Sequence, residues 1–348
     1  MQYIKRSTTD RPRLPYVSTA AVSVGTVVVF VWWWWTKRQK EQPPSKWRKV
    51  GELSDLVVYP VKSLGPIRIN KLECTILGSK SGWLRDRALM VTDQSGHFVT
   101  ARQWPQMVLV SPSISGSILT LSAPGMPSES IDLSQLQGKG KRVTLWGSPV
   151  DIYDCGDAPA RWLSQFLLQK DTGLRLVYHP WDFSTRGLPD KRRRFSITTK
   201  DTGVYQDETS YCLINESSVT ELNTRLDEPV TPQHFRPNFV IKGATAFEED
   251  SWGWVKIGDV IFKCVRPCTR CLMITINPET GMKSPIVEPM KTLKSYRQVM
   301  DPVIRPVVGE SPVMGVHLGL RGPSGTIQLG DPVYVGVPEV QPILISSP

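Results

Sequence analysis

The sequence predicts a mainly β protein of the α+β class, with a β-barrel in its C-terminal half and one membrane helix before the globular part. Apolar residues occur in short alternating runs bounded by Gly, Pro and Asn, as in strands joined by turns. Two segments, 254–262 and 325–334, each place a Gly-Asp turn between two strand-like runs. Two such hairpins favour a barrel over a doubly wound sheet.

Residues 17–35 contain no charged side chain and predict the membrane helix. Four tryptophans at 32–35 suit the membrane–water interface. A cleaved signal peptide is the alternative, although these tryptophans occupy the place of small cleavage-site residues. The segment after the predicted membrane helix, residues 36–50, is more basic than the segment before it, residues 1–16. The positive-inside rule therefore predicts that the C-terminal part lies in the cytosol. We expect residues 1–50 to form a tail, the anchor and a basic tether over 36–50.

After the tether we expect two domains, at 51–180 and 181–337, and a flexible tail at 338–348. Asp157 is expected to cap a helix that ends at Leu168, since proline occupies its first turn. A second short helix is predicted over 217–226. The remaining predicted elements of the first domain are strands, at 56–63, 89–93 and 97–100 (a hairpin), 107–110, 118–121, 143–146 and 150–153.

The formal net charge of +10 favours an anionic partner or an anionic membrane surface. The run from Lys191 to Arg194 predicts either a solvated loop or a docking patch for an acidic protein or lipid. Nothing in the sequence has the signature of a nucleic-acid-binding module, so no nucleic-acid partner is expected. Six scattered cysteines do not form the framework of a secreted disulfide protein, which favours a reducing compartment.

Residues 258–281 contain three of the six cysteines and two arginines, and are therefore the strongest candidate for a reactive or metal-binding site. Alternating apolar residues at 260–262 and 272–276 predict two strands, with a tight loop from Arg266 to Cys271 between them. Cys268 and Cys271 share this loop with Arg266 and Arg270, and neighbouring arginines favour the thiolate form that attacks or binds a metal. The alternative is a reduced pair of buried cysteines beside two solvated arginines.

Three metal hypotheses compete for these cysteines. Cys268 and Cys271 have the spacing of half a zinc site, but no second pair exists and the four histidines are dispersed. With Cys264 they have the spacing of an iron–sulfur radical enzyme, but no βα pattern follows. The third hypothesis is a metal that is carried by an organic cofactor and ligated by one cysteine. Polar residues at other strand ends offer cations and hydroxyls suited to a phosphate and a polar ring.

Six motifs together resemble those of the mitochondrial amidoxime-reducing components, membrane-anchored members of the MOSC (molybdenum cofactor sulfurase C-terminal) superfamily. They are the segments 59–63, 84–87, 99–103, 235–238, 266–271 and 293–297. The resemblance covers roughly residues 50–336. It implies a MOSC β-barrel domain at 181–337 behind a β-rich MOSC-associated domain at 51–180. It also implies the outer mitochondrial membrane with the catalytic part facing the cytosol, another intracellular membrane being the alternative.

The resemblance further implies a molybdopterin-type molybdenum cofactor whose metal is ligated by a cysteine. Cys271 matches that ligand and is the expected catalytic residue, whereas Cys268 matches a neighbour that is not a ligand. Asp207 or Glu208 is the candidate catalytic base. The positions that match cofactor-binding residues are Lys62, Ser63, Arg87, Thr209, Ser210, Arg236, Asn238, Thr269, Arg270 and Cys271.

The implied activity is the reduction of N-hydroxylated compounds, namely amidoximes, hydroxylamines and N-hydroxyguanidines. Electrons are expected from NADH through cytochrome b-five reductase and cytochrome b-five, and the protein is expected to be a monomer. The sequence departs from the family after Lys62-Ser63 and at 206–210, which leaves the shape of the pocket open. The alternative function is a molybdenum cofactor carrier or sulfur-transfer module without reductase activity.

Overall fold

The computed structural model describes residues 42–136, 141–145, 147–184, 195, 197–338 and 344–346. The predicted anchor at 17–35 and the basic run from Lys191 to Arg194 lie outside these residues, as does most of the C-terminal tail. No helix within the described ranges has both the length and the apolar character needed to cross a bilayer.

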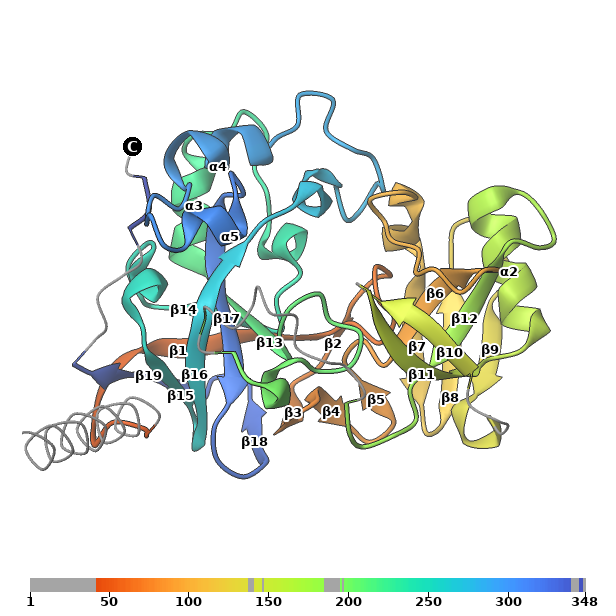
Figure 1. The fold of residues 1–348 in the computed structure, drawn as a ribbon, viewed down its shortest axis with the longest axis horizontal. Helices are drawn as coiled ribbons and strands as arrows, with labels where there is room; N and C mark the ends of the chain where they lie inside the picture. Colours follow the sequence, from red (N-terminus) through yellow and green to blue (C-terminus); the bar gives the residue numbers. More distant parts are fainter. Residues whose placement is uncertain are drawn as a thin grey trace, which may run out of the picture. The chain divides into compact units, whose positions relative to one another are not determined.

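Seven strands close into a β-barrel, which confirms that the protein is mainly β with a barrel, although one barrel strand comes from the N-terminal half of the chain (Figure 1). The barrel closes because β1 pairs with β19 on one side and with β14 on the other. The β13–β14 pair is parallel, and the other neighbours in the barrel are antiparallel. In order around the barrel the strands are β14 (Phe239–Lys242), β13 (Tyr211–Asn215), β17 (Val313–Leu320), β16 (Val260–Thr269), β15 (Trp254–Ile257), β19 (Pro332–Val337) and β1 (Lys46–Val58).

The first barrel strand corrects the predicted tether. β1 begins at Lys46, so residues 46–50 belong to the barrel and not to a linker. Lys46, Arg48 and Lys49 are exposed at the start of this strand, Trp47 is half-buried, and Val50 is buried. An antiparallel sheet tolerates charges on a solvated face, which is why a basic composition did not exclude a strand.

Inward-facing apolar side chains fill the barrel. Tyr211, Phe239 and Phe262 are fully buried, and their three ring-to-ring centroid distances lie between 5.3 and 5.5 Å. Two of these contacts are edge-to-face, a favourable geometry for aromatic pairs. This aromatic cluster makes the barrel a packed core, so any cofactor has to bind outside the barrel interior.

A second core lies in the N-terminal half and is covered by helix α2 (Asp157–Leu168), whose bounds match the prediction. Trp162 and Leu163 of this helix pack with Leu176 of the adjoining sheet. Gly156, and not Asp157, occupies the N-cap position. The sheet order is β10 (Lys141–Leu145), β11 (Ser148–Asp154), β12 (Leu174–Tyr178), β6 (Leu89–Asp93), beside a three-stranded sheet of β7 (Ser111–Ser115), β8 (Ile118–Ser122) and β9 (Glu129–Asp132).

The remaining elements are short. The helix predicted at 217–226 is α3 (Glu216–Asn223), and the Asn215 side chain caps it by accepting from Ser217 N. Helices α4 (Met290–Tyr296) and α5 (Arg305–Val308) were not predicted. β2 (Ile67–Arg68) pairs with β1, and a small sheet has the order β18 (Gly325–Gln328), β3 (Lys71–Thr75), β4 (Gly78–Ser81), β5 (Leu84–Arg85).

Two predicted strands are wrong, and one predicted hairpin does not form. The segment predicted as a strand at 107–110 lies mostly in a 3-10 helix, Pro105–Leu109, and the one at 272–276 in another, Leu272–Thr275. Short apolar runs do not distinguish a strand from a helical turn, which explains both errors. The hairpin 254–262 is confirmed as β15–β16, but β18 and β19 do not pair with each other, because β18 pairs with β3 and β19 with β15 and β1.

Candidate active site

A cavity of about 150 Å³ opens where several strand ends and loops meet. The loop after β1 contributes Lys62 and Ser63, and the end of β16 contributes Cys268 and Thr269. All predicted cofactor-binding residues line this cavity except Ser210. Its lining contains five basic side chains and two carboxylates, so the cavity is suited to an anion.

Ser210 is the one predicted cofactor-binding residue that the structure does not place on the cavity wall. Its hydroxyl donates to the carbonyl oxygens of Ile76, at 2.7 Å, and Asp201, at 3.2 Å. The side chain is 1% exposed. Ser210 therefore stabilises the turn that precedes β13.

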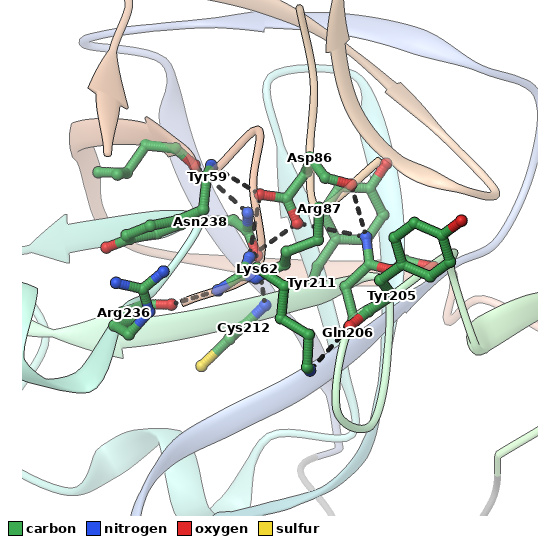
Figure 2. A network of polar contacts seen from close by, with 12 residues as sticks. Tyr59, Lys62, Asp86, Arg87, Tyr205, Gln206, Tyr211, Cys212, Arg236 and Asn238 are labelled. Atoms are coloured by element: carbon green, nitrogen blue, oxygen red, sulfur yellow. Dashed lines mark hydrogen bonds and ion pairs between the residues drawn. The ribbon is translucent and has the colours of Figure 1, made fainter. Parts of the chain in front are cut away.

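Two arginines lie on the ring of Tyr59. The guanidinium carbons of Arg87 and Arg236 are 4.6 and 4.1 Å from the ring centroid. Asp86 pairs with Arg87 at 2.7 Å and also accepts from the Tyr59 backbone N–H at 2.9 Å (Figure 2). The aromatic ring and the buried carboxylate together hold the cations in fixed positions.

Arg236 has no such carboxylate. Its Nη2 donates to the Leu64 carbonyl at 2.8 Å, and in the described part of the chain no Asp or Glu forms an ion pair with it. Burial lowers the pKa of Arg236 to about 10, so the side chain still carries its charge at neutral pH. A half-buried cation without an anionic partner is less stable than a paired one, which suits a site that receives an anion.

Three cavity residues adopt a strained backbone conformation. Ser63, Arg87 and Arg236 have φ angles of 71°, 46° and 51°, in the left-handed region that non-glycine residues rarely occupy. Strained residues of this kind cluster at functional sites, where the surrounding structure enforces them. Their coincidence with the cavity supports a functional role for this wall.

Lys62 and Asp207 form an ion pair, and Lys62 Nζ also donates to the Tyr205 carbonyl at 2.9 Å. The Asp207 side chain is 51% exposed, and the charge and hydrogen bond of Lys62 lower its pKa to about 2. Glu208 pairs with Arg266 at 2.9 Å. Both carboxylates that the sequence offered as a catalytic base therefore neutralise neighbouring cations.

The predicted cysteine loop is instead the end of a strand. Residues 266–269 belong to β16, and Cys271 occupies the N-cap position of the 3-10 helix Leu272–Thr275. Cys271 is exposed, whereas Cys268 is 3% exposed. This difference separates two thiols that their spacing alone could not rank.

Cys212 of β13 is a site residue that the sequence did not single out. Its Sγ lies 3.8 Å from Cys268 Sγ and 3.5 Å from Arg270 Nη2. The hydrogen bond with Cys268 and the charge of Arg270 lower the pKa of Cys212 to about 6, although burial opposes this. Burial and the contact with Cys212 raise the pKa of Cys268, and these effects outweigh the two neighbouring arginines that were expected to favour its thiolate form.

Other residues of the cavity wall were not predicted to bind the cofactor, although Thr100, Arg102, Phe235 and Cys268 lie in motifs that carry the resemblance. Thr209 was predicted, but its partner His317, with Nδ1 at 2.9 Å from Thr209 Oγ1, was not. The arrangement depends on pairing between β13 and β17, which the sequence does not reveal. The further lining residues that were not predicted are Thr100, Arg102, Gln206, Cys212, His234, Phe235, Cys268, Met273, Ile274 and His317.

The cavity offers little to a bare metal ion. Within the described residues, no three His, Cys, Asp or Glu side chains gather closely enough to hold one. A metal that arrives inside an organic cofactor needs fewer protein donors, and an exposed thiolate is a soft donor suited to it. The site geometry therefore favours the third of the three cysteine hypotheses.

Comparison with known proteins agrees with this geometry. Residues 50–170 match the MOSC N-terminal beta barrel domain, and residues 200–334 match the MOSC domain. Fold and site thus define a protein of the MOSC class that has both domains.

Similarity to curated proteins identifies one family within the MOSC class. The chain is 39% identical to mitochondrial amidoxime-reducing component 1 of Homo sapiens over 291 residues, which cover 83% of this chain and 84% of the relative. It is 37% identical to the Mus musculus component 1, over 91% and 89% of the two chains, and 37% identical to the Bos taurus component 2, over 82% and 84%. The chain belongs to the family of mitochondrial amidoxime-reducing components.

Proposed function

We propose that this protein is a molybdenum-cofactor-dependent reductase of N-hydroxylated compounds, namely amidoximes, hydroxylamines and N-hydroxyguanidines. Its curated relatives are named for the reduction of amidoximes. The observation that carries the proposal is the cavity, which combines the exposed Cys271 with five basic side chains that are buried or half-buried.

The residues present fit a molybdopterin-type cofactor. Arg236 is a half-buried cation that pairs with no carboxylate among the described residues, and Arg87 lies beside it on the same aromatic ring. With Lys62 they would hold the cofactor phosphate. Cys271 would ligate the molybdenum, and Ser63, Thr209, Asn238 and Thr269 would hydrogen-bond the pterin. The bound cofactor would supply the two-electron chemistry that takes oxygen from an N–OH group.

The protein contributes preorganisation. Asn238 Nδ2 donates to the Val57 carbonyl at 3.3 Å, and its Oδ1 accepts from Cys212 N at 3.2 Å, so the amide is already oriented. Asp86 fixes Arg87 by two contacts of 2.7 and 2.9 Å. Buried apolar side chains, including Phe235 and Ile274, form part of the wall and exclude water from it. Groups that are held in place before binding lose little entropy when a ligand arrives.

The proposal includes the cellular setting of the reaction. Electrons would come from NADH through cytochrome b-five reductase and cytochrome b-five, and the net charge of +10 would favour encounter with an acidic partner. The relatives are named mitochondrial. We place the protein at the outer mitochondrial membrane as an anchored monomer with its catalytic part toward the cytosol.

Turnover of benzamidoxime with the reconstituted cytochrome chain tests the proposal. Cys271→Ser should abolish turnover, because a serine oxygen does not replace the soft thiolate donor. Cys155→Ser is the matched control, since Cys155 is a buried cysteine of the N-terminal core and should leave turnover close to wild type.

Wild-type turnover in Cys271→Ser would refute the proposal. Wild-type protein that holds molybdopterin but reduces no amidoxime would instead favour the cofactor carrier or sulfur-transfer function.

A further inference from the structure

Arg270, the residue before the proposed metal ligand, is engaged by the protein itself. Its Nε donates to the Met314 carbonyl at 2.8 Å, its Nη1 to the Phe235 carbonyl at 2.8 Å, and its Nη2 contacts Cys212 Sγ at 3.5 Å. All three guanidinium nitrogens thus have protein acceptors. Arg270 therefore braces the wall of the cavity and has little donor capacity left for a cofactor phosphate.

The positive charge of the buried Arg270 side chain has one candidate for an anionic partner, the sulfur of Cys212. Arg270 is 7% exposed, and no carboxylate in the described residues pairs with it. The two carbonyls that accept from it are neutral. Cys212 Sγ is the one ionisable acceptor among its hydrogen-bond partners, and it lies 3.8 Å from Cys268 Sγ. A buried guanidinium that donates to a sulfur favours the anionic form of that sulfur.

The two cysteines are not arranged as a disulfide. Cys212 is on β13 and Cys268 on β16, and β17 pairs with both strands and lies between them. Two inter-strand spacings put their Cα atoms roughly 9 Å apart. A disulfide requires Cα atoms within about 7 Å. The pair therefore persists as a hydrogen bond between a thiol and a sulfur acceptor.

We propose that Cys212 is a positioning residue, whose sulfur is the anionic partner of Arg270 and through it fixes the Cys271 segment at the cavity wall. Cys212 also joins a second part of the site, because its backbone N–H donates to Asn238 Oδ1. One residue of β13 thus contacts the end of β16 through its sulfur and the turn before β14 through its backbone. This inference rests on the proposed role of Cys271 as the metal ligand.

The charged and titratable groups around Cys212 agree with this role. Arg270 and Arg87 are both cations that favour an anionic sulfur, and Cys268 contributes a hydrogen bond. His317 is the cross-strand partner of Cys212 on β17, and its Nδ1 is 2.9 Å from Thr209 Oγ1.

Cys212→Asp and Cys212→Asn test the inference, because the two side chains match in shape and differ in charge. Three quantities are measured in the full-length protein: molybdenum content, melting temperature, and kcat and KM for benzamidoxime. If Cys212 acts as an anion, Asp should keep molybdenum content and kcat within about threefold of wild type, whereas Asn should lose about tenfold in kcat. Equal behaviour of Asp and Asn would overturn the inference.

A second measurement applies if neither variant folds. The ultraviolet absorbance of thiolate is compared between wild type and Cys212→Ser as the pH is raised from about 5 to about 8. Wild type should show one more thiolate than Cys212→Ser, and identical curves would overturn the inference. Wild-type protein without molybdenum or turnover would refute the proposed function, while the difference in melting temperature between Asp and Asn would still report on Cys212.

Discussion

Replacement of Glu249 by glutamine should stabilise the protein at alkaline pH. Glu249 is 0% exposed and lies in the 3-10 helix Glu248–Ser251. Ser218 Oγ donates to its carboxylate at 2.8 Å, and Asn215 Nδ2 donates at 3.1 Å. Burial is the main cause that raises the pKa of Glu249 from 4.5 to about 7, and these hydrogen bonds offset only part of it.

The raised pKa of Glu249 gives the magnitude and the sign of the change in the free energy of unfolding with pH. A carboxyl with a folded-state pKa of about 7 and an ordinary value of 4.5 stays protonated in the folded protein while the unfolded chain ionises. Between these two values the free energy of unfolding should fall by about 1.4 kcal/mol per pH unit, for a total of about 3 kcal/mol. Glutamine does not titrate, so Glu249→Gln should escape this loss above about pH 7.

Urea unfolding of wild type and Glu249→Gln at about pH 5 and about pH 8 measures the effect. The variant should gain about 2 to 3 kcal/mol over wild type at the higher pH, relative to their difference at the lower pH. Glu248→Gln is the neighbouring control, because Glu248 pairs with Arg48 at 2.7 Å and its pKa is lowered, so this substitution should not stabilise the protein. A Glu249→Gln difference that does not change with pH would refute the reasoning.

Three further predictions concern the cavity and its surroundings. Asp86→Ala should lower the free energy of unfolding by about 3 to 5 kcal/mol, measured by urea unfolding, because it leaves Arg87 as an unpaired buried charge. Tyr59→Leu should reduce molybdenum retention and cost about 1 to 4 kcal/mol through the loss of its ring contacts with Arg87 and Arg236, whereas Tyr59→Phe, which keeps the ring, should retain molybdenum. Turnover with the cytochrome should fall as ionic strength rises and screens the basic surface, and a flat salt dependence would argue against electrostatic steering.

Helix α2 and the β15–β16 hairpin could be predicted because their signals are local. Helix α2 has the predicted bounds, and β15–β16 forms around the Gly-Asp turn that the sequence displayed. Leu272 and Ile274 were misassigned, since four residues of an apolar run do not contain enough periods to separate a strand from a 3-10 helix. The local sequence pattern therefore predicted helix α2 and the β15–β16 hairpin, but it did not predict the short 3-10 helix that follows Cys271.

The candidate site could be predicted only where a motif marked it. Lys62, Arg87 and Arg236 were found by resemblance, and the structure brings them together in one cavity. Cys212 was missed because its contact with Cys268 joins two strands that both pair with β17. Pairing of strands far apart in sequence is set by tertiary structure, and no pattern within either segment reveals it.

Metal analysis of the purified protein tests the central claim most directly, that Cys271 holds the molybdenum of a cofactor bound in this cavity. The account predicts molybdenum in stoichiometric amount and no zinc in wild type, with molybdenum retained in Cys155→Ser and largely lost in Cys271→Ser. Zinc in place of molybdenum in wild type, or the same molybdenum content in Cys271→Ser as in wild type, would contradict it.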